Sequence, residues 1–151
     1  MLELARPDER SAVNLLAAQV HRMHVRLRPD IYEPADEMWT KARFDDAVMQ
    51  RQLFVAKLDN HVVGYVLVRI REYQMPGHIK RKILFIDEIC VDEVFRNQGI
   101  GTQTVIEVRA IAKAFGCKEI RLGVYPQNNT ALSFYQKCGF HIRSIDMEMK
   151  L

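Results

Sequence analysis

The sequence predicts a single α/β (α+β) domain in which helices flank a largely antiparallel β-sheet. The chain has 151 residues, the length of one ordinary domain, which can bury roughly 70% of its unfolded surface. Hydrophobic residues make up 48% and charged residues 27% of the chain, a balance typical of a globular protein rather than a disordered or fibrous one. Helix-like and strand-like segments follow one another along the whole chain.

The first part of the chain is expected to form one strand and two helices. Residues 1–6 are a short strand candidate, and Pro7 begins a helix over 8–27 because proline and the acids after it suit a first turn. Apolar residues recur along this helix at three- and four-residue spacing, and Pro29 ends it. Residues 36–51 form a weaker amphipathic helix.

A hairpin and a third long strand follow. Leu53–Leu58 and residues 62–70 are rich in Val and Leu, and the residues at 59–61 accept tight-turn geometry. Residues 75–82 contain Pro, Gly and three consecutive basic residues, so we expect a solvated tip there. From this tip the chain enters a strand over 83–91.

The last part of the chain alternates helices and strands again. Residues 102–115 have a broad apolar helical face that Gly116 closes as a C-cap, and residues 119–125 alternate as a strand. Residues 128–137 form another helix, and residues 140–151 alternate as a final strand or bent pair of strands. We find no repeats or linkers, so residues 1–151 are expected to be one domain.

Charge and cysteine content exclude several classes of protein. The net charge of +3 is too balanced for a dedicated nucleic-acid binder, although a small anionic ligand is easily accommodated. The cysteines Cys90, Cys117 and Cys138 lack zinc or redox spacing, so we expect reduced thiols, no metal and a cytoplasmic protein. No long apolar stretch or signal-peptide layout is present, so no membrane partner is expected.

The strongest chemical signal is a glycine turn between a strand and a helix. After residues 83–91 and an acidic loop at 92–95 comes Arg96-Asn97-Gln98-Gly99-Ile100-Gly101, followed by the apolar helix. Such a turn brings backbone N–H groups and a helix start together, which suits a pyrophosphate. The alternative is a helix N-terminus that merely contains glycines. Walker and Rossmann turns are disfavoured because the P-loop Lys-Ser/Thr pair and the third Rossmann glycine are missing.

Two motifs carry a resemblance to a known family. Arg96-x-x-Gly99-x-Gly101 resembles the acyl-CoA signature Gln/Arg-x-x-Gly-x-Gly/Ala of the GNAT superfamily of N-acetyltransferases. The stretch from Asn128 to Phe140 is similar to the later GNAT pattern Asn-x-x-Ala-x-x-Phe/Leu-Tyr-x-x-x-Gly-Phe. The resemblance implies the GNAT fold across the chain, a mixed, mostly antiparallel sheet of six to seven strands flanked by about four helices.

The resemblance also implies a site for acetyl-CoA, the acyl donor. The cofactor would lie in a splay between the strand ending near Val91 and the strand ending near Tyr125. Its pantetheine arm would pair with the strand backbone, and its pyrophosphate would bind the N–H groups of the glycine turn. The implied cofactor-binding residues are Ile89, Cys90, Val91, Arg96, Asn97, Gln98, Gly99, Ile100, Gly101, Thr102, Asn128, Ala131 and Tyr135.

Acetyl transfer to an amine needs a neutral amine, a stabilised oxyanion and a proton for the departing thiolate. Tyr135 stands where the resemblance places a general acid, and Phe134 and Phe140 would keep it partly dry. The alternative is a buried aromatic residue with a bonded hydroxyl. A backbone N–H near Val91 is the expected oxyanion donor.

Asp87 and Glu88 are the candidates for the catalytic base. They are adjacent in the strand over 83–91, so their side chains should point to opposite faces, with only one in the substrate cleft. An adjacent acidic pair resembles the diamine-acetylating branch of the family, and Glu88 is slightly favoured. A water chain as base, or two ion-paired acids without a catalytic role, are the alternatives.

The sequence therefore predicts an N-acetyltransferase that uses acetyl-CoA. The acceptor stays open among a small polyamine-like or amino-acid amine, an aminoglycoside and a protein N-terminus. Tyr32 and Trp39 lie in the region that usually forms the acceptor wall, or else belong to the core. The alternative function is a non-catalytic acyl-CoA-binding regulatory module. Residues 142–149 could pair across a sheet edge, which makes a homodimer possible.

Overall fold

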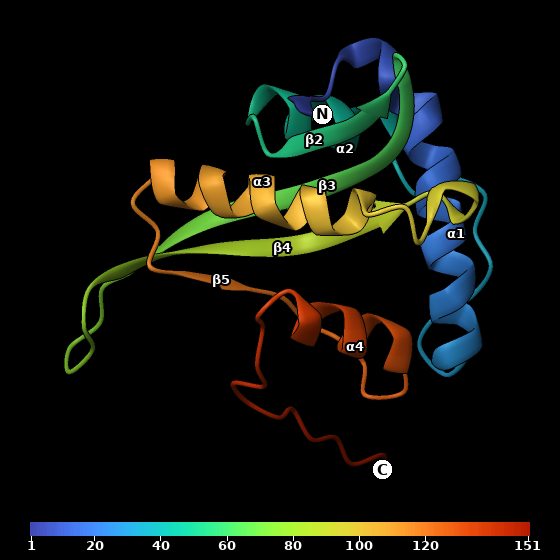
Figure 1. The fold of residues 1–151 in the computed structure, drawn as a ribbon. Coiled ribbons are helices and arrows are strands. Elements are labelled where there is room, and N and C mark those ends of the chain that lie inside the picture. Colours follow the sequence, from blue (N-terminus) through green and yellow to red (C-terminus); the bar gives the residue numbers. More distant parts are fainter.

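The computed structural model describes all 151 residues and has the predicted mixed architecture of helices around a sheet (Figure 1). The strands are β1 (Leu2–Leu4), β2 (Leu53–Leu58), β3 (His61–Tyr73), β4 (Arg81–Val91) and β5 (Glu119–Arg121). The α-helices are α1 (Arg10–Leu27), α2 (Lys41–Met49), α3 (Ile100–Ala114) and α4 (Asn129–Lys137). Short 3-10 turns cover Pro7–Glu9 and Glu93–Phe95. None of the helices combines the length and hydrophobicity that a membrane span requires.

The sheet is mostly antiparallel, as predicted. Its strand order is β1-β2-β3-β4-β5, in which the first four strands are antiparallel neighbours and β5 runs parallel to β4. The pairing of β4 with β5 covers only Ile83 to Phe85 on the β4 side. From Ile86 to Val91 the β5-facing edge of β4 has no strand beside it, so its backbone groups on that side have no strand partner.

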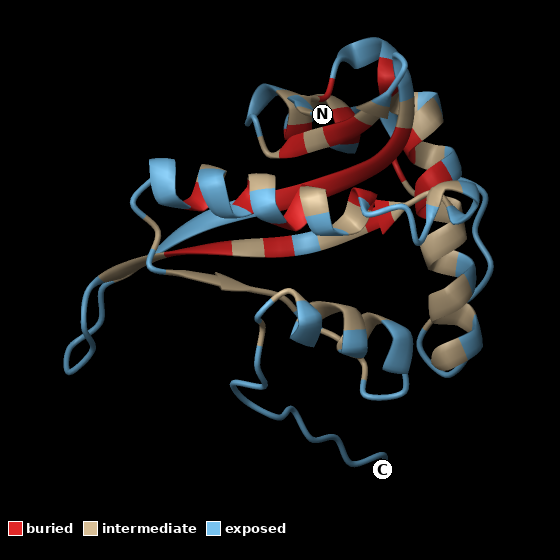
Figure 2. Cartoon of the chain, in the orientation of Figure 1, coloured by how far each residue is buried: buried red, intermediate tan, exposed pale blue.

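Side chains of the central strands fill a core on each face of the sheet, because successive residues of a strand point to opposite faces. On one face Tyr65 of β3 packs with Trp39 and Phe44 against α1 and α2. On the other face Val66 of β3 packs beneath α3 with residues such as Val108. Figure 2 shows this burial concentrated in β2, β3 and β4. The central strands are therefore fixed from both sides.

The second predicted helix is shorter than residues 36–51. It begins at Lys41 because the Thr40 hydroxyl accepts the Arg43 N–H at 3.3 Å and caps the first turn. The residues before it are held by Asn14 of α1, whose Oδ1 accepts the Trp39 N–H at 2.7 Å and whose Nδ2 donates to the Trp39 carbonyl at 2.9 Å. These bonds fix the Trp39 backbone over the sheet, where its side chain is fully buried.

The prediction of six to seven strands is too high, because the C-terminal part of the chain adds none. The strand expected over 119–125 ends at Arg121, and no strand forms over 140–151. The last backbone–backbone hydrogen bond is donated by the Phe140 N–H to Tyr135. An alternation of polar and apolar residues forms a strand only where a sheet edge can satisfy its backbone hydrogen bonds. Residues 141–151 lie extended and exposed, with no sheet edge beside them (Figure 2).

Candidate active site

The glycine turn leaves the start of α3 without a cap. Asn97 and Gly99 have positive φ angles of 62° and 82°, and Gly99 occupies the N-cap position with no side chain that could accept a hydrogen bond. The first N–H groups of a helix have no partner inside the helix. In α3 these donors belong to Ile100, Gly101 and Thr102. An uncapped helix start of this kind favours an anion.

The two sequence motifs meet at Gly101. A Cβ atom on Gly101 would lie 3.1 Å from Cζ of Phe134 and 3.7 Å from Cγ2 of Val91. The missing side chain therefore lets α4 approach the start of α3 and the end of β4. Asn128 fixes the first turn of α4, since its Oδ1 accepts the Ala131 N–H at 3.1 Å. Asn128 and the Ala131 N–H are thus engaged with each other.

Three predicted cofactor residues lie on the open edge of β4. The Ile89 side chain packs beneath α3, whereas Cys90 is buried on the α1 face and its thiol donates to the Leu16 carbonyl at 3.4 Å. Burial raises the pKa of Cys90 to about 12, which makes the thiol a packing group rather than a nucleophile. At the end of the strand, Arg96 Nε donates to the Val91 carbonyl at 3.0 Å. The side chain of Arg96 thereby links the glycine turn to β4.

Tyr135 lies in an aromatic environment on α4. Its ring centroid is 5.2 Å from that of Phe134 and 5.7 Å from that of Phe140, in agreement with the partly dry surroundings expected for it. Burial raises the pKa of Tyr135 to about 12, and the nearby Cys138 and Cys90 thiols act in the same direction. The phenol therefore keeps its proton throughout the physiological pH range and can act as a proton donor.

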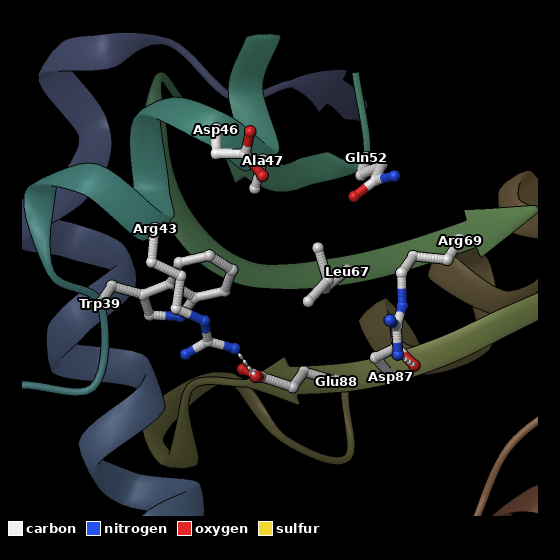
Figure 3. A pocket seen from close by; sticks show the side chains of 9 residues that line it. All are labelled: Trp39, Arg43, Asp46, Ala47, Gln52, Leu67, Arg69, Asp87 and Glu88. Carbon is white, nitrogen blue, oxygen red and sulfur yellow. Dashed lines mark hydrogen bonds and ion pairs between the residues drawn. The ribbon is translucent and has the colours of Figure 1, made fainter. Parts of the chain in front are cut away.

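The expectation that Asp87 and Glu88 point to opposite faces is wrong. Leu67 pairs with Glu88 and Val68 pairs with Ile86, so Asp87 is the extra residue of a β-bulge. The bulge breaks the alternation of side chains, and both carboxylates line one cavity of about 370 Å³ between α2 and the sheet (Figure 3).

Asp87 and Glu88 are each paired with an arginine in this cavity. Arg43 of α2 forms an ion pair with Glu88, whose second oxygen accepts the Tyr65 hydroxyl at 2.9 Å. Arg69 of β3 holds Asp87 through two nitrogens, with Nη2 at 2.8 Å from Oδ1. Burial and the Glu88 charge raise the pKa of Tyr65 far above its usual range, so it remains a donor to Glu88.

An aromatic cluster joins α1 to the segment after β5. The Tyr32 and Tyr125 hydroxyls are 2.9 Å apart, and the His24 ring stacks on Tyr32 with centroids 5.1 Å apart. Burial lowers the pKa of His24, the nearby His21 adds to this effect, and Glu88 opposes it. His24 is therefore mostly neutral at physiological pH, and the Glu88 carboxylate is near enough to influence it. The cluster connects the two sides of the region where β4 and β5 separate.

Comparisons with known proteins agree with this geometry. The family model described as "Acetyltransferase (GNAT) family" matches residues 18–140, which is most of the chain. The chain belongs to the GNAT acetyltransferase family. An N-alpha-acetyltransferase of Sulfurisphaera tokodaii is 33% identical over 58% of this chain and 54% of its own length. The L-amino acid N-acetyltransferase AaaT of Escherichia coli is 27% identical over 78% of this chain and 74% of its own length.

A solved structure matches this GNAT chain over its whole length. The F44R mutant of the BH1408 protein from Bacillus halodurans has a TM-score of 0.95 and 28% identity, and the match covers 100% of this chain and 99% of that one. Over the first curated relatives, the matched region spans 54%, 44% and 64% of the relative's length. The chain thus covers about half of those relatives, while its fold is matched completely.

In this GNAT chain the sequence indicated the glycine turn, the β4 edge and Tyr135 as candidate site residues, which stay predictions, and it missed the partners of the acidic pair. Arg43, Tyr65 and Arg69 reach the carboxylates from two other elements, α2 and β3. Only the register of β3 against β4 identifies Arg69 as a neighbour of Asp87, and a single sequence does not contain that register. The signal available in the sequence was the presence of a basic residue, Arg69, in the strand that precedes the acidic pair, which makes an ion pair between neighbouring strands possible.

Proposed function

We propose that this chain is an N-acetyltransferase that moves an acetyl group from acetyl-CoA to a primary amine by direct attack. The observation that supports this most is the contact of the two motifs at Gly101. Because of that contact, the uncapped start of α3, the open edge of β4 and the helix α4, which carries the Tyr135 phenol, lie next to one another. The alternative, a non-catalytic acyl-CoA-binding regulatory module, has no observation in its favour.

The donor site suits a long anionic thioester. The backbone N–H groups from Asn97 to Thr102 are proposed to hold the pyrophosphate, because α3 offers them no cap. The backbone of Ile89, Cys90 and Val91 is proposed to pair with the pantetheine arm, since no strand occupies that edge. Acetyl-CoA supplies an activated acyl group at this point. The side chains of Asn128 and Arg96 are proposed to shape the site from α4 and the glycine turn.

In the proposed reaction, the amine nitrogen forms a bond to the thioester carbonyl carbon and the carbon–sulfur bond breaks. A backbone N–H near Val91 would stabilise the oxyanion, and the Tyr135 phenol would give its proton to the leaving thiolate. Glu88 is proposed to take the amine proton, directly or through water. Both Glu88 oxygens already accept hydrogen bonds, which favours a water-mediated step.

The function is tested by measuring thiol release from acetyl-CoA with a panel of amino acids, polyamines, aminoglycosides and N-terminal peptides. We expect turnover with at least one class, together with the acetylated amine by mass spectrometry. Calorimetry run alongside is expected to show saturable binding of acetyl-CoA. Binding without turnover across the panel would support the regulatory module, and absence of binding would contradict the whole assignment.

We also propose that residues 141–151 pair with a second copy of the chain to form a homodimer. The segment exposes a row of apolar side chains, namely Ile142, Ile145, Met147, Met149 and Leu151. Its polar residues Glu148 and Lys150 contact Arg28 at 2.6 Å and Asp30 at 2.7 Å. β5 is a short edge strand, so each copy offers both an unpaired segment and an unpaired edge. α4 buries no residue fully, which leaves apolar surface beside that edge.

Light scattering after size exclusion is expected to give twice the chain mass of 17.6 kDa. Ile145→Asp should shift the protein toward the monomer, because it places a charge among the apolar side chains of the paired segment. Ile79→Asp is the matched control, since Ile79 is equally exposed at 82% against 78% but lies on the hairpin tip. A monomer at all concentrations, or equal behaviour of the two variants, would exclude this interface.

The chain is further proposed to be cytoplasmic. Its three cysteines, Cys90, Cys117 and Cys138, are all free, which is typical of a reducing compartment.

A further inference from the structure

The cavity of Asp87 and Glu88 is not simply acidic. Arg43 and Arg69 line it together with Asp46, Asp87 and Glu88, so its charged groups nearly balance. The arginine side chains are the more exposed members of the two ion pairs, at 40% and 46%, against 29% for Glu88 and 22% for Asp87. A molecule entering from solvent therefore meets guanidinium groups as readily as carboxylates.

The two arginines are held differently. Arg43 is fixed by three partners, because it pairs with Glu88, donates to the Met38 carbonyl at 2.8 Å and lies 3.9 Å above the Trp39 ring. Arg69 uses Nε and Nη2 on Asp87, which leaves the N–H groups of Nη1 for another acceptor. A guanidinium presents N–H groups in a planar fork that matches a carboxylate.

Trp39 lines this same cavity but adds no donor that a ligand could reach (Figure 3). Its side chain is fully buried beneath Arg43, and its Nε1 has neither exposed surface nor a hydrogen-bond partner. The donor that the cavity leaves free for a ligand is therefore Nη1 of Arg69.

We infer that the acceptor carries a carboxylate next to its primary amine, as in the class of free amino acids. This inference rests on the proposed acetyltransferase function and concerns the acceptor end of the same site. The amine would lie at Glu88 of β4, and the carboxylate would lie at Arg69 of the neighbouring strand β3. Glu88 pairs with Leu67, and Arg69 is two residues further along β3 than Leu67. Arg43 is a positioning residue that orients Glu88.

The same charges disfavour polyamines and aminoglycosides. A second ammonium group in the cavity would lie beside Arg43 or Arg69, and the carboxylates of Asp87 and Glu88 are already engaged by these guanidinium groups. Asp46, on the α2 side of the cavity, is the one acidic residue there without an arginine partner. The adjacent acidic pair, which by itself suggests a diamine acceptor, therefore does not act as free negative charge. The sequence alone could not distinguish a diamine acceptor from an amino-acid acceptor, because Arg43 and Arg69 come from α2 and β3 rather than from the strand that carries the acidic pair.

The test compares each amino acid with its own carboxamide, which replaces the carboxylate with a neutral group of similar shape, and kcat/KM is expressed per unprotonated amine because the carboxamide also lowers the amine pKa. Thiol release is measured for both members, and their binding to the protein in the presence of CoA is measured by calorimetry. For the preferred side chain, we expect kcat/KM and affinity to be at least tenfold higher for the acid than for the amide. Equal values for acid and amide, or faster acetylation of polyamines, would overturn the inference.

Variants locate the effect at Arg69. In Arg69→Gln the acid-to-amide ratio is expected to fall toward one through a higher KM for the acid, and Arg69→Lys should restore it in part. Arg71→Gln is the matched control, because Arg71 lies on the same strand but against the Phe85 ring, outside the cavity. A ratio unchanged in Arg69→Gln, with folding verified by circular dichroism, would also overturn the inference.

The outcomes separate the two proposals. Turnover of a diamine but of no amino acid would leave the acetyltransferase proposal standing and remove this one. Absence of acetyl-CoA binding would remove the acetyltransferase proposal, and the acid-versus-amide affinity measured by calorimetry would still decide whether the cavity recognises a carboxylate.

Discussion

Replacing Tyr135 with phenylalanine is expected to lower kcat by about 10²–10⁴-fold, the usual contribution of a general acid. The substitution keeps the ring between Phe134 and Phe140, at centroid distances of 5.2 and 5.7 Å, and removes only the hydroxyl. The affinity for acetyl-CoA should therefore change little. Pre-steady-state thiol release at saturating substrates, with calorimetry of acetyl-CoA binding, measures the two effects separately.

The pH dependence gives the same prediction a second test. The pKa of Tyr135 is raised to about 12, so the phenol is protonated well past neutral pH and its role as an acid should not be lost there. The ratio of wild-type to Tyr135→Phe activity should stay high up to the pH at which the phenol ionises. Tyr73→Phe is the control, because Tyr73 packs on Phe85 at the opposite end of β4. Equal activity of Tyr135→Phe and wild type, with chemistry rate-limiting, would rule out this role.

Replacing Trp39 with alanine is expected to lower the free energy of unfolding by about 3–5 kcal/mol. The Trp39 side chain is fully buried, and its ring meets those of Phe44 and Tyr65 edge-to-face at centroid distances of 6.0 and 6.2 Å. The substitution would leave a space beneath Arg43, next to the cavity that holds Asp87 and Glu88. Equilibrium urea unfolding measures the loss.

Trp39→Phe should restore much of this stability, since it keeps an aromatic ring in the core and removes the unpaired Nε1 donor. A loss below about 1 kcal/mol in Trp39→Ala would mean that the surrounding residues collapse into the space, in contrast to the rigid packing inferred here.

Much of the fold follows from local sequence patterns. The hairpin of β2 and β3, the long β4 and the helix after the glycine turn each have a strong periodic signal and clear breakers. Gly99 illustrates why the turn was recognisable, because its positive φ angle is a conformation that glycine adopts without strain. The family resemblance then linked this turn to the motif on α4.

Features that depend on contacts between distant segments were not predictable. The bulge at Asp87 arises from the pairing of β3 with β4. The start of α2 depends on the hydrogen bond that the Trp39 N–H donates to Asn14. The C-terminal segment alternates like a strand, but a strand needs an edge, and the chain places none beside residues 141–151. In each case the deciding partner lies far away in the sequence.

We propose that the glycine turn and α4 build one acetyl-CoA site, and titration calorimetry of Gly101→Val tests this proposal. A side chain at Gly101 would press on Phe134, whose Cζ lies 3.1 Å from the Cβ position, and push α4 away from α3. Wild type and the control Gly77→Asn, in the hairpin tip where a Cβ meets nothing within 4 Å, should bind acetyl-CoA equally. We predict at least tenfold weaker binding in folded Gly101→Val. Unchanged affinity in that variant, or no binding by wild type, would rule out a site shared by the glycine turn and α4.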